Sequence, residues 1–337
     1  MNVLFGTSFG SQKAILEKFN GENSHNINLI SPDDYSEQTL LKYAPETDVL
    51  ITDSISKEFL NQAPHLKYIQ IPYTGANGLD FNLLKNYPSV TVTNSHSNSL
   101  TIAEHAVALL FTVAKQINYR DAHMRQGDWS TRYERVMNSF PLVGKTAGII
   151  GYGAIGEKTA KMLKFGFDMK ILGIKRHPEE IKDNICDFLG GIEDMPKVLQ
   201  ESDFIIVALP LTNETRGIIN KEQFDMMKKG AIIVNIARGP IIEEKALYDF
   251  LKSKKGYAGI DVWYNYPSSE TDITQGKDKK TFQNYPFHEL ENIVMSPHSA
   301  FRVADIGVKT GEDIITNLML LSEGKQPINI LHSDLGY

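Results

Sequence analysis

The sequence predicts an α/β protein with two doubly wound, parallel-sheet domains. Short apolar runs alternate with amphipathic, helix-patterned stretches over most of the chain, as in a mostly parallel sheet covered by helices. The chain has 337 residues, which exceeds the size of one typical hydrophobic core and is enough for two. A long helical pattern that begins near residue 100 separates a first series of strands from a second.

The composition is that of a soluble globular protein, with 42% hydrophobic and 23% charged residues. The net charge of −6 argues against wholesale nucleic-acid binding. Because Cys186 is the lone cysteine, no internal disulfide is possible, which predicts a reducing cytoplasm and a buried, inert thiol. The N-terminus has no signal-peptide pattern and no apolar run approaches a membrane span, so we expect no membrane partner.

Five strands are predicted before residue 95, with helical patterns at 12–19 and 37–43 between some of them. The predicted strands are 2–5, 26–30, 48–52, 67–71 and 89–93. One long helix, at roughly 100–125, follows, because its apolar residues recur at helical spacing. Such a helix bridges two domains, carries a subunit interface or is an ordinary core helix.

From residue 145 a second alternation predicts another doubly wound domain. Its predicted strands are 146–151, 169–174, 203–209, 231–235, 256–263 and 292–296. The polar stretch 265–285 is predicted to be a surface excursion. The tail from about residue 303 has helical character through residue 321.

The motif GYGAIG (151–156) follows the apolar run TAGII and opens a helical stretch. In that context a GxGxxG pattern predicts the phosphate-binding turn of a Rossmann dinucleotide domain. Gly151 permits the tight turn, Gly153 lets the backbone approach a pyrophosphate, and Gly156 allows close packing of helix on strand. The N–H groups and dipole of the helix start then bind the diphosphate. A glycine turn in some other strand–helix unit is the alternative.

The strand that follows, within ILGIKRHP (171–178), ends in three nitrogen-bearing side chains. A dinucleotide of the NAD type normally meets an acidic residue about twenty residues beyond the glycines. Nineteen residues after Gly156 stands Lys175, followed by Arg176 and His177. These basic side chains favour the 2′-phosphate of NADP, so we predict NADP(H) in preference to NAD(H). A solvated basic turn is the alternative, and His177 is either a third contact or exposed.

Polar residues follow several of the predicted strands, where ligands bind in open α/β sheets. Arg238 comes after AIIVN, Asp261 after YAGI and His298 after NIVMS. An arginine there can grip a carboxylate with two parallel hydrogen bonds, and a histidine can exchange a proton near neutral pH. Singly, each has a structural explanation; together they indicate hydride transfer beside a carboxylate-bearing substrate.

At these residues the sequence resembles the D-isomer-specific 2-hydroxyacid dehydrogenase family, its glyoxylate and hydroxypyruvate reductases in particular, over nearly the whole chain. Several motifs carry the resemblance, and KGAIIVNIARG is the most specific run. They are GKTAGIIGYGAIG (144–156), ESDFIIVALPLTNETRGIIN (201–220), KKGAIIVNIARGPIIEE (228–244), GYAGIDVW (256–263), NIVMSPHSA (292–300), QGDW (126–129) and NSLTIAEHAVALL (98–110).

The resemblance implies a Rossmann cofactor domain (97–301), a flavodoxin-like substrate domain (1–96 with 302–337) and a homodimer paired through the cofactor domains. Arg238 would bind the substrate carboxylate, and His298 would act as the general acid and base. The backbone of Thr74, Gly75, Ala76 and Asn77 would help to hold the carboxylate. Further cofactor contacts are implied at Thr101, Ala154, Ile155, Leu209, Pro210, Thr212, Thr215, Ile236, Ala237, Asp261 and His298. No metal site is assigned.

One position departs from the family pattern. The family usually has a glutamate five residues after the aspartate, where this chain has Tyr266. That glutamate pairs with the histidine and favours its charged form. Without it, we expect His298 to lose its proton more easily, unless another carboxylate fills the role.

The leading functional hypothesis is an NADP(H)-dependent reductase of small 2-ketoacids such as glyoxylate or hydroxypyruvate. A dinucleotide-sensing, corepressor-like binding protein is one alternative, to which the missing glutamate gives weight. The retained Arg238 and His298 weigh against it. A dehydrogenase of another oxyanion, such as phosphite, is a further alternative.

Overall fold

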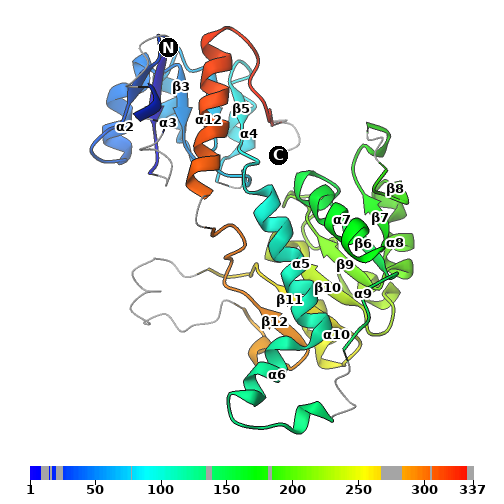
Figure 1. Ribbon diagram of the computed structural model, residues 1–337. Helices are drawn as coiled ribbons and strands as arrows, with labels where there is room; N and C mark the ends of the chain where they lie inside the picture. The colour runs from blue at the N-terminus through cyan, green and yellow to red at the C-terminus, as the bar shows by residue number, and fades with distance from the viewer. Residues whose placement is uncertain are drawn as a thin grey trace. The chain divides into compact units, whose positions relative to one another are not determined.

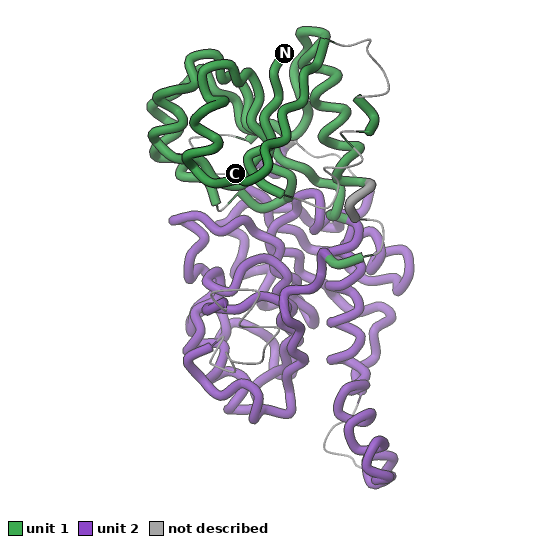
Figure 2. Tube along the Cα trace, turned by 90° about the vertical axis from the view of Figure 1, so that its left-hand side faces the viewer, with its two compact units in different colours: residues 1–99, 302–337 green, residues 100–301 purple. Residues whose placement is uncertain are grey.

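The protein is described here from a computed structural model (Figure 1). The structure describes residues 1–8, 15, 17–19, 26–76, 78–133, 139–180, 184–266, 283–303 and 306–331. The chain divides into two compact units, shown in Figure 2. Unit 1 comprises residues 1–99 and 302–337, and unit 2 comprises residues 100–301.

Unit 1 contains a five-stranded sheet in the order β2-β1-β3-β4-β5, with all neighbours parallel. This order is that of flavodoxin-like folds, so the predicted class of this unit is confirmed. The predicted strands are confirmed too, although most are shorter at their ends. They are β1 (Asn2–Phe5), β2 (Asn28–Ile30), β3 (Val49–Ile51), β4 (Tyr68–Gln70) and β5 (Thr91–Thr93).

Helices cover both faces of this sheet. Successive strand residues point to opposite sides, so neighbouring apolar residues pack against different helices. Leu4 packs in one apolar cluster with residues of α3 (Lys57–Gln62), whereas Val3 packs in another with α12 (Ile306–Ser322). The remaining helices described here are α2 (Glu37–Tyr43) and α4 (Phe81–Leu84). Of the helix predicted at 12–19, residues 15 and 17–19 are described and helical, and the others lie outside the described residues.

Unit 2 contains a seven-stranded parallel sheet in the order β12-β11-β10-β9-β6-β7-β8. Strand order reverses between β6 and β9, which is the position where ligands bind in open α/β sheets. The strands are β6 (Thr146–Ile150), β7 (Lys170–Ile174), β8 (Phe188–Gly190), β9 (Phe204–Val207), β10 (Ile232–Asn235), β11 (Tyr257–Ile260) and β12 (Ile293–Met295). The edge strand β8 was not predicted, since it is only three residues long and partly buried.

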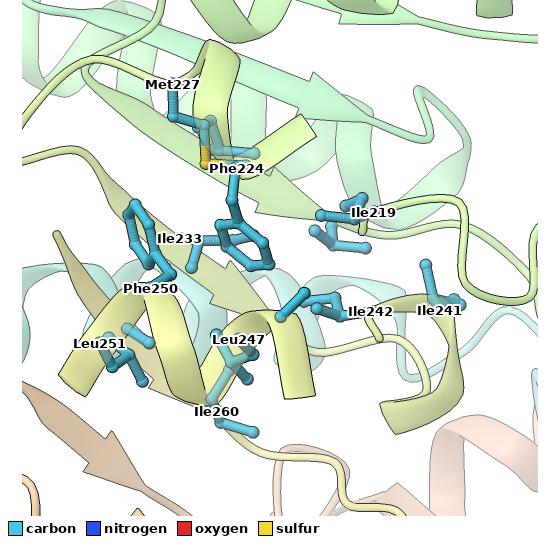
Figure 3. Close-up of a cluster of buried hydrophobic side chains, with 14 of the residues drawn as sticks. Ile219, Phe224, Met227, Ile233, Ile241, Ile242, Leu247, Phe250, Leu251 and Ile260 are labelled. Atoms are coloured by element: carbon cyan, nitrogen blue, oxygen red, sulfur yellow. The ribbon is translucent and has the colours of Figure 1, made fainter. Parts of the chain in front are cut away.

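Two large apolar clusters form most of the core of unit 2, one on each face of the sheet, and a small third one lies around Leu172, Ile174 and Val198. Residues of α5 (Ser99–Lys115) and α7 (Ala154–Phe167) belong to the first cluster. Residues of α8 (Met195–Glu201), α9 (Lys221–Met226) and α10 (Glu244–Lys252) belong to the second, which Figure 3 shows around Phe224 and Phe250. These rings stack with their centroids 4.6 Å apart. The sheet is therefore buried on both sides, and its strand ends are left to form a site.

The prediction of one continuous helix over 100–125 is wrong. Gln116 takes a left-handed φ of 55° and separates α5 from α6 (Ile117–Met124). Its backbone and side-chain N–H groups both donate to the Val113 carbonyl, which closes the end of α5. Within the described part of the chain no single helix is long and apolar enough to cross a membrane; only this pair, bent by 63°, passes that test jointly.

Cys186 also departs from expectation, since it is half-buried and not fully enclosed. The polar excursion predicted at 265–285 lies largely outside the described residues, which resume at Gln283. Gln283 itself is buried, at 4% exposed, and Tyr285 stacks on Tyr248 of α10. The excursion thus ends against the core of unit 2.

Candidate active site

The predicted site residues of unit 2 lie at one edge of its sheet. All seven strands run parallel, so their carboxyl ends meet at the same edge. Gly151 directly follows β6 and Lys175 directly follows β7. Arg238 and His298 come three residues after β10 and β12. The sheet therefore brings the glycine turn and both polar side chains to a common edge.

The glycine turn has a different steric requirement at each glycine. Gly151 has a φ of 106°, and a Cβ there would come within 2.6 Å of the Ala208 carbonyl. A Cβ on Gly156 would lie 2.2 Å from the Gly151 carbonyl oxygen, so the helix passes very close to the turn. A Cβ on Gly153 would meet no atom within 4 Å. The space beside Gly153 lies at the start of α7, where no side chain caps the helix.

The basic end of β7 is paired with an acidic side chain. Lys175 continues the sheet by donating its backbone N–H to the Gly190 carbonyl at 3.0 Å. The guanidinium of Arg176 forms an ion pair with the carboxylate of Glu214, which lies in the loop after β9. The Glu214 side chain is 75% exposed. The side chain of His177 is 54% exposed and lies 3.7 Å from Glu179.

The loop after β9 is held by its own threonines. Thr215 donates its hydroxyl to the Pro210 carbonyl at 2.6 Å and accepts the Thr212 backbone N–H at 2.8 Å. The Thr215 N–H in turn donates to the Thr212 hydroxyl at 3.2 Å. Both hydroxyls predicted to contact the cofactor thus take part in shaping the loop that presents Glu214.

The loop after β10 positions Arg238 through Asn235. The Asn235 side chain accepts the Ala237 N–H and donates to the Arg238 carbonyl, both at 3.1 Å. Arg238 is half-buried, and this burial lowers the pKa of its guanidinium; its Nη1 donates to the Ala237 carbonyl at 2.7 Å. Gly239 is required next, because a Cβ there would lie 2.3 Å from the Trp263 carbonyl oxygen. The loops after β10 and β11 are therefore in close contact.

Asp261, which was expected to contact the cofactor, is wholly buried. Its carboxylate accepts the Ser296 hydroxyl at 2.5 Å, the Ser299 N–H at 2.9 Å and the Ala300 N–H at 3.1 Å. Burial acts to raise the pKa of Asp261, but these donors and His105 lower it to about 2. The carboxylate is therefore charged and fully engaged with the turn around His298.

His298 lies close to Tyr266 and within the field of Arg238. The rings of His298 and Tyr266 have centroids 5.4 Å apart. Burial and the Arg238 charge lower the pKa of His298, and the Asp261 charge opposes them. Tyr266 accepts the Trp263 N–H at 3.1 Å, and burial raises the pKa of its hydroxyl. Tyr266 thus adds no negative charge beside His298 at neutral pH.

The predicted carboxylate-binding loop lies in unit 1. The Thr74 hydroxyl donates to the Ser95 carbonyl at 3.0 Å and to the Asn98 side chain. Ala76 is 8% exposed, and its carbonyl accepts the Leu79 N–H. Asn77 lies outside the described residues. The Thr74 side chain is therefore committed to the neighbouring loop.

The remaining predicted cofactor residues have varied surroundings. Thr101 is buried in the first turn of α5. Ile236 and Ala237 are buried, at 5% and 7% exposed. Ala154, Ile155, Leu209 and Pro210 are partly buried. Within the described ranges, no group of three or more histidine, cysteine, aspartate and glutamate side chains is placed to hold a metal ion.

Sequence reasoning missed three polar groups that shape this edge of the sheet: His105, Asn235 and Ser296. Trp263 donates its indole N–H to the Ser296 carbonyl at 2.8 Å. Asn235 ends the buried strand β10 and Ser296 directly follows β12, and these positions at strand ends would have flagged them. His105 is the only one carried by a helix, where it flanks an apolar stripe.

The parallel sheet and its glycine turn define unit 2 as a dinucleotide-binding domain. The family model "D-isomer specific 2-hydroxyacid dehydrogenase, NAD binding domain" matches residues 107–300. The chain therefore belongs to the D-isomer-specific 2-hydroxyacid dehydrogenases, a family of NAD(P)-dependent oxidoreductases. The resemblance stated from sequence is thus confirmed.

Known proteins related to the chain cover nearly all of it. It is 33% identical over 312 residues to the glyoxylate reductase of Pyrococcus horikoshii, covering 88% of this chain and 86% of that protein. It is 31% identical over 298 residues to the D-3-phosphoglycerate dehydrogenase of Archaeoglobus fulgidus, but spans only about half (52%) of that relative's length against 86% of its own. A solved acyclic imino acid reductase (Bsp5), in complex with NADPH and D-Arg, superposes with a TM-score of 0.78 at 26% identity, covering 98% of this chain and 100% of that one.

Proposed function

We propose that the protein is an NADP(H)-preferring reductase that interconverts a small 2-ketoacid and its D-2-hydroxyacid. The observation that carries the proposal is the placement of Arg238 and His298 at the same sheet edge as the glycine turn. A carboxylate-binding group, a proton donor and a dinucleotide turn are the parts that this reaction requires. The relative from Pyrococcus horikoshii, named a glyoxylate reductase, supports this substrate class.

The glycine turn fits the diphosphate of a nicotinamide dinucleotide. The open space beside Gly153 leaves room for the diphosphate to approach the backbone. The α7 start has no side-chain cap, so its N–H groups and dipole are directed at an anion. Gly151 and Gly156 hold the turn in this shape, because a side chain on either would strike backbone atoms.

The cofactor preference rests on the end of β7. Lys175 and Arg176 occupy the place where NAD-binding domains carry an acidic residue. Arg176 is already oriented by Glu214, and that exposed ion pair is worth at most about 1 kcal/mol. A 2′-phosphate, which forms stronger bidentate hydrogen bonds, therefore competes well for the guanidinium. The structurally similar acyclic imino acid reductase, which was solved in complex with NADPH, lends further support.

The bound dinucleotide supplies the hydride for reduction and accepts it in oxidation. Arg238, which stays charged despite its burial, orients the substrate carboxylate with paired N–H donors. His298 in its protonated form donates to the substrate carbonyl oxygen and takes that proton back in the reverse direction. Residues 1–96 with 302–337, which make up most of unit 1, serve as the substrate domain.

We also propose a homodimer that pairs through unit 2. In Figures 1 and 2, α6 and the following segment project from the body of this unit. Within the described chain α6 buries none of its side chains. The exposed apolar side chains here are Ile117, Met124, Trp129 and Tyr133, at 43–78% exposed. Apolar surface of this kind marks an interface.

The decisive experiment compares NADPH with NADH across a panel of 2-ketoacids. Arg176→Ala should raise the dissociation constant of NADPH at least about tenfold, because a charge-assisted contact is lost, and leave that of NADH within about twofold. Glu214→Gln is the matched variant, which keeps the arginine and should bind NADPH at least as well. Both constants come from the quenching of protein fluorescence.

Four outcomes would contradict parts of this proposal. If Arg176→Ala raised the dissociation constants of NADPH and NADH equally, the end of β7 would be a solvated basic turn and not a binding site for the 2′-phosphate. Unchanged kcat and KM in Arg238→Ala would remove the site assignment. Dinucleotide binding with no turnover across the whole panel would favour the sensing alternative, and turnover of phosphite alone would favour the oxyanion alternative.

A further inference from the structure

The turn that carries His298 has an unusual backbone conformation. His298 has a φ of 55°, in the left-handed region that side chains other than glycine rarely occupy. Such a conformation persists only where the surrounding structure imposes it. The turn begins with a sheet hydrogen bond from the Ser296 N–H to the Ile260 carbonyl at 2.8 Å. What holds its far side therefore decides where the imidazole points.

Asp261 holds the far side of this turn. Its two oxygens accept the backbone N–H groups of Ser299 and Ala300, the two residues that follow His298. The side chain of Asp261 is 0% exposed. A carboxylate buried to this extent is stable only when donors satisfy its lone pairs. Its third donor is the Ser296 hydroxyl, at 2.5 Å.

His105 approaches this carboxylate from helix α5. Its Nε2 lies 3.2 Å from the Ser296 hydroxyl oxygen and 3.5 Å from an oxygen of Asp261. Because Ser296 gives its hydrogen to Asp261, its oxygen accepts from His105, which places a hydrogen on Nε2. Ala106 and Leu109 anchor α5 in the core of unit 2. A continuous chain of donors thus runs from a rigid helix to the turn around His298.

We propose that His105 is a positioning residue for His298. Its Nε2–H orients the Ser296 hydroxyl toward Asp261, and Asp261 then fixes the N–H groups that hold His298 in the left-handed conformation. His105 itself takes no part in proton transfer. The proposal rests on the proposed function only in that His298 is taken as the proton donor to the substrate.

The test compares two single variants and their double variant, each in the intact protein with glyoxylate and NADPH. His105→Phe keeps the ring but removes the donor, and Ser296→Ala removes the hydroxyl that links His105 to Asp261. Each should lower kcat about tenfold, while the KM for glyoxylate and the dissociation constant of NADPH stay within about twofold. The double variant should be no slower than the slower single variant, because both break the same path.

Two controls separate positioning from general damage. His105→Gln restores an N–H donor and should recover most of kcat. His288→Phe makes the same change at a histidine whose side chain is 62% exposed, and should leave kcat unchanged. In ¹⁵N-histidine-labelled protein, the His298 imidazole signals should shift in His105→Phe and not in His288→Phe.

Each failure points to a different premise. No turnover by the wild type, or full turnover by His298→Asn, would overturn the proposed function. Turnover that depends on His298 but is unaffected by His105→Phe would overturn the positioning role, as would additive losses in the double variant or a parallel loss of NADPH affinity. If His105→Phe does not fold, an unchanged kcat in Ser296→Ala would overturn it.

Discussion

Tyr266 is the side chain that separates this site from the usual family pattern. It stands where a glutamate is expected, with its ring beside that of His298 and its hydroxyl bonded to the Trp263 N–H. Burial raises the pKa of the Tyr266 hydroxyl, so it stays neutral at physiological pH. His298 therefore has Asp261 as its favourable charge and Arg238 as its unfavourable one, and its pKa is lowered.

This arrangement predicts an unusual pH dependence for reduction. The reaction needs protonated His298, and a lowered pKa means that this form disappears at a lower pH than for an ordinary imidazole. Tyr266→Glu should raise the pKa of His298 by about one unit, because an opposite charge favours the protonated form. The falling limb of kcat/KM for ketoacid reduction should move to higher pH by the same amount. Tyr266→Gln is the neutral control, and an identical profile for wild type and Tyr266→Glu would show that another carboxylate already serves His298.

At the scale of elements, the glycines of the turn between β6 and α7 have separate roles, one in binding the cofactor and another in the stability of the fold. A side chain at Gly153 meets no protein atom but fills the space left for the diphosphate. Gly153→Val should therefore weaken NADPH binding at least about tenfold and change the free energy of unfolding by less than about 1 kcal/mol. Gly156→Val should instead destabilise the fold by about 2 kcal/mol or more, because a side chain there overpacks against the backbone of the turn. Urea unfolding and NADPH titration measure the two effects, and a Gly153→Val protein that binds NADPH normally would place the diphosphate elsewhere.

At the scale of the whole molecule, the projecting α6 segment exposes apolar surface, and the fold of a single chain gives no reason for that exposure. Trp129 is 60% exposed there, and the helix before it buries no side chain among the described residues. If this surface pairs two copies, Trp129 is a strong anchor, since tryptophan is enriched at the energetic centre of interfaces. Trp129→Ala should weaken the dimer by about 2 kcal/mol, roughly 30-fold in its dissociation constant. Sedimentation velocity over a dilution series measures this. A monomeric wild type would refute the dimer, and an unchanged constant would place the interface elsewhere.

Local sequence signals predicted the architecture well, because each depends on neighbouring residues. Apolar runs predicted eleven of the strands in both sheets, and the glycine spacing predicted the turn after β6. The break between α5 and α6 was missed, since Gln116 is an unusual residue for a left-handed conformation. The edge strand β8 was missed because a short, half-buried strand carries little hydrophobic pattern.

The sequence by itself determined the fold class, the family and the residue types that end the strands, because these follow from periodicity and short motifs. Only the tertiary structure decided what those residues touch. It paired Arg176 with Glu214, enclosed Asp261 within the turn of His298, and brought His105 to the same carboxylate. The separations along the chain are 38 residues between Arg176 and Glu214, 38 between Asp261 and Ser299 of the turn, and 156 between His105 and Asp261. The physical reason is that contacts between strand ends and helices depend on how the sheet is ordered and packed, which no local pattern records.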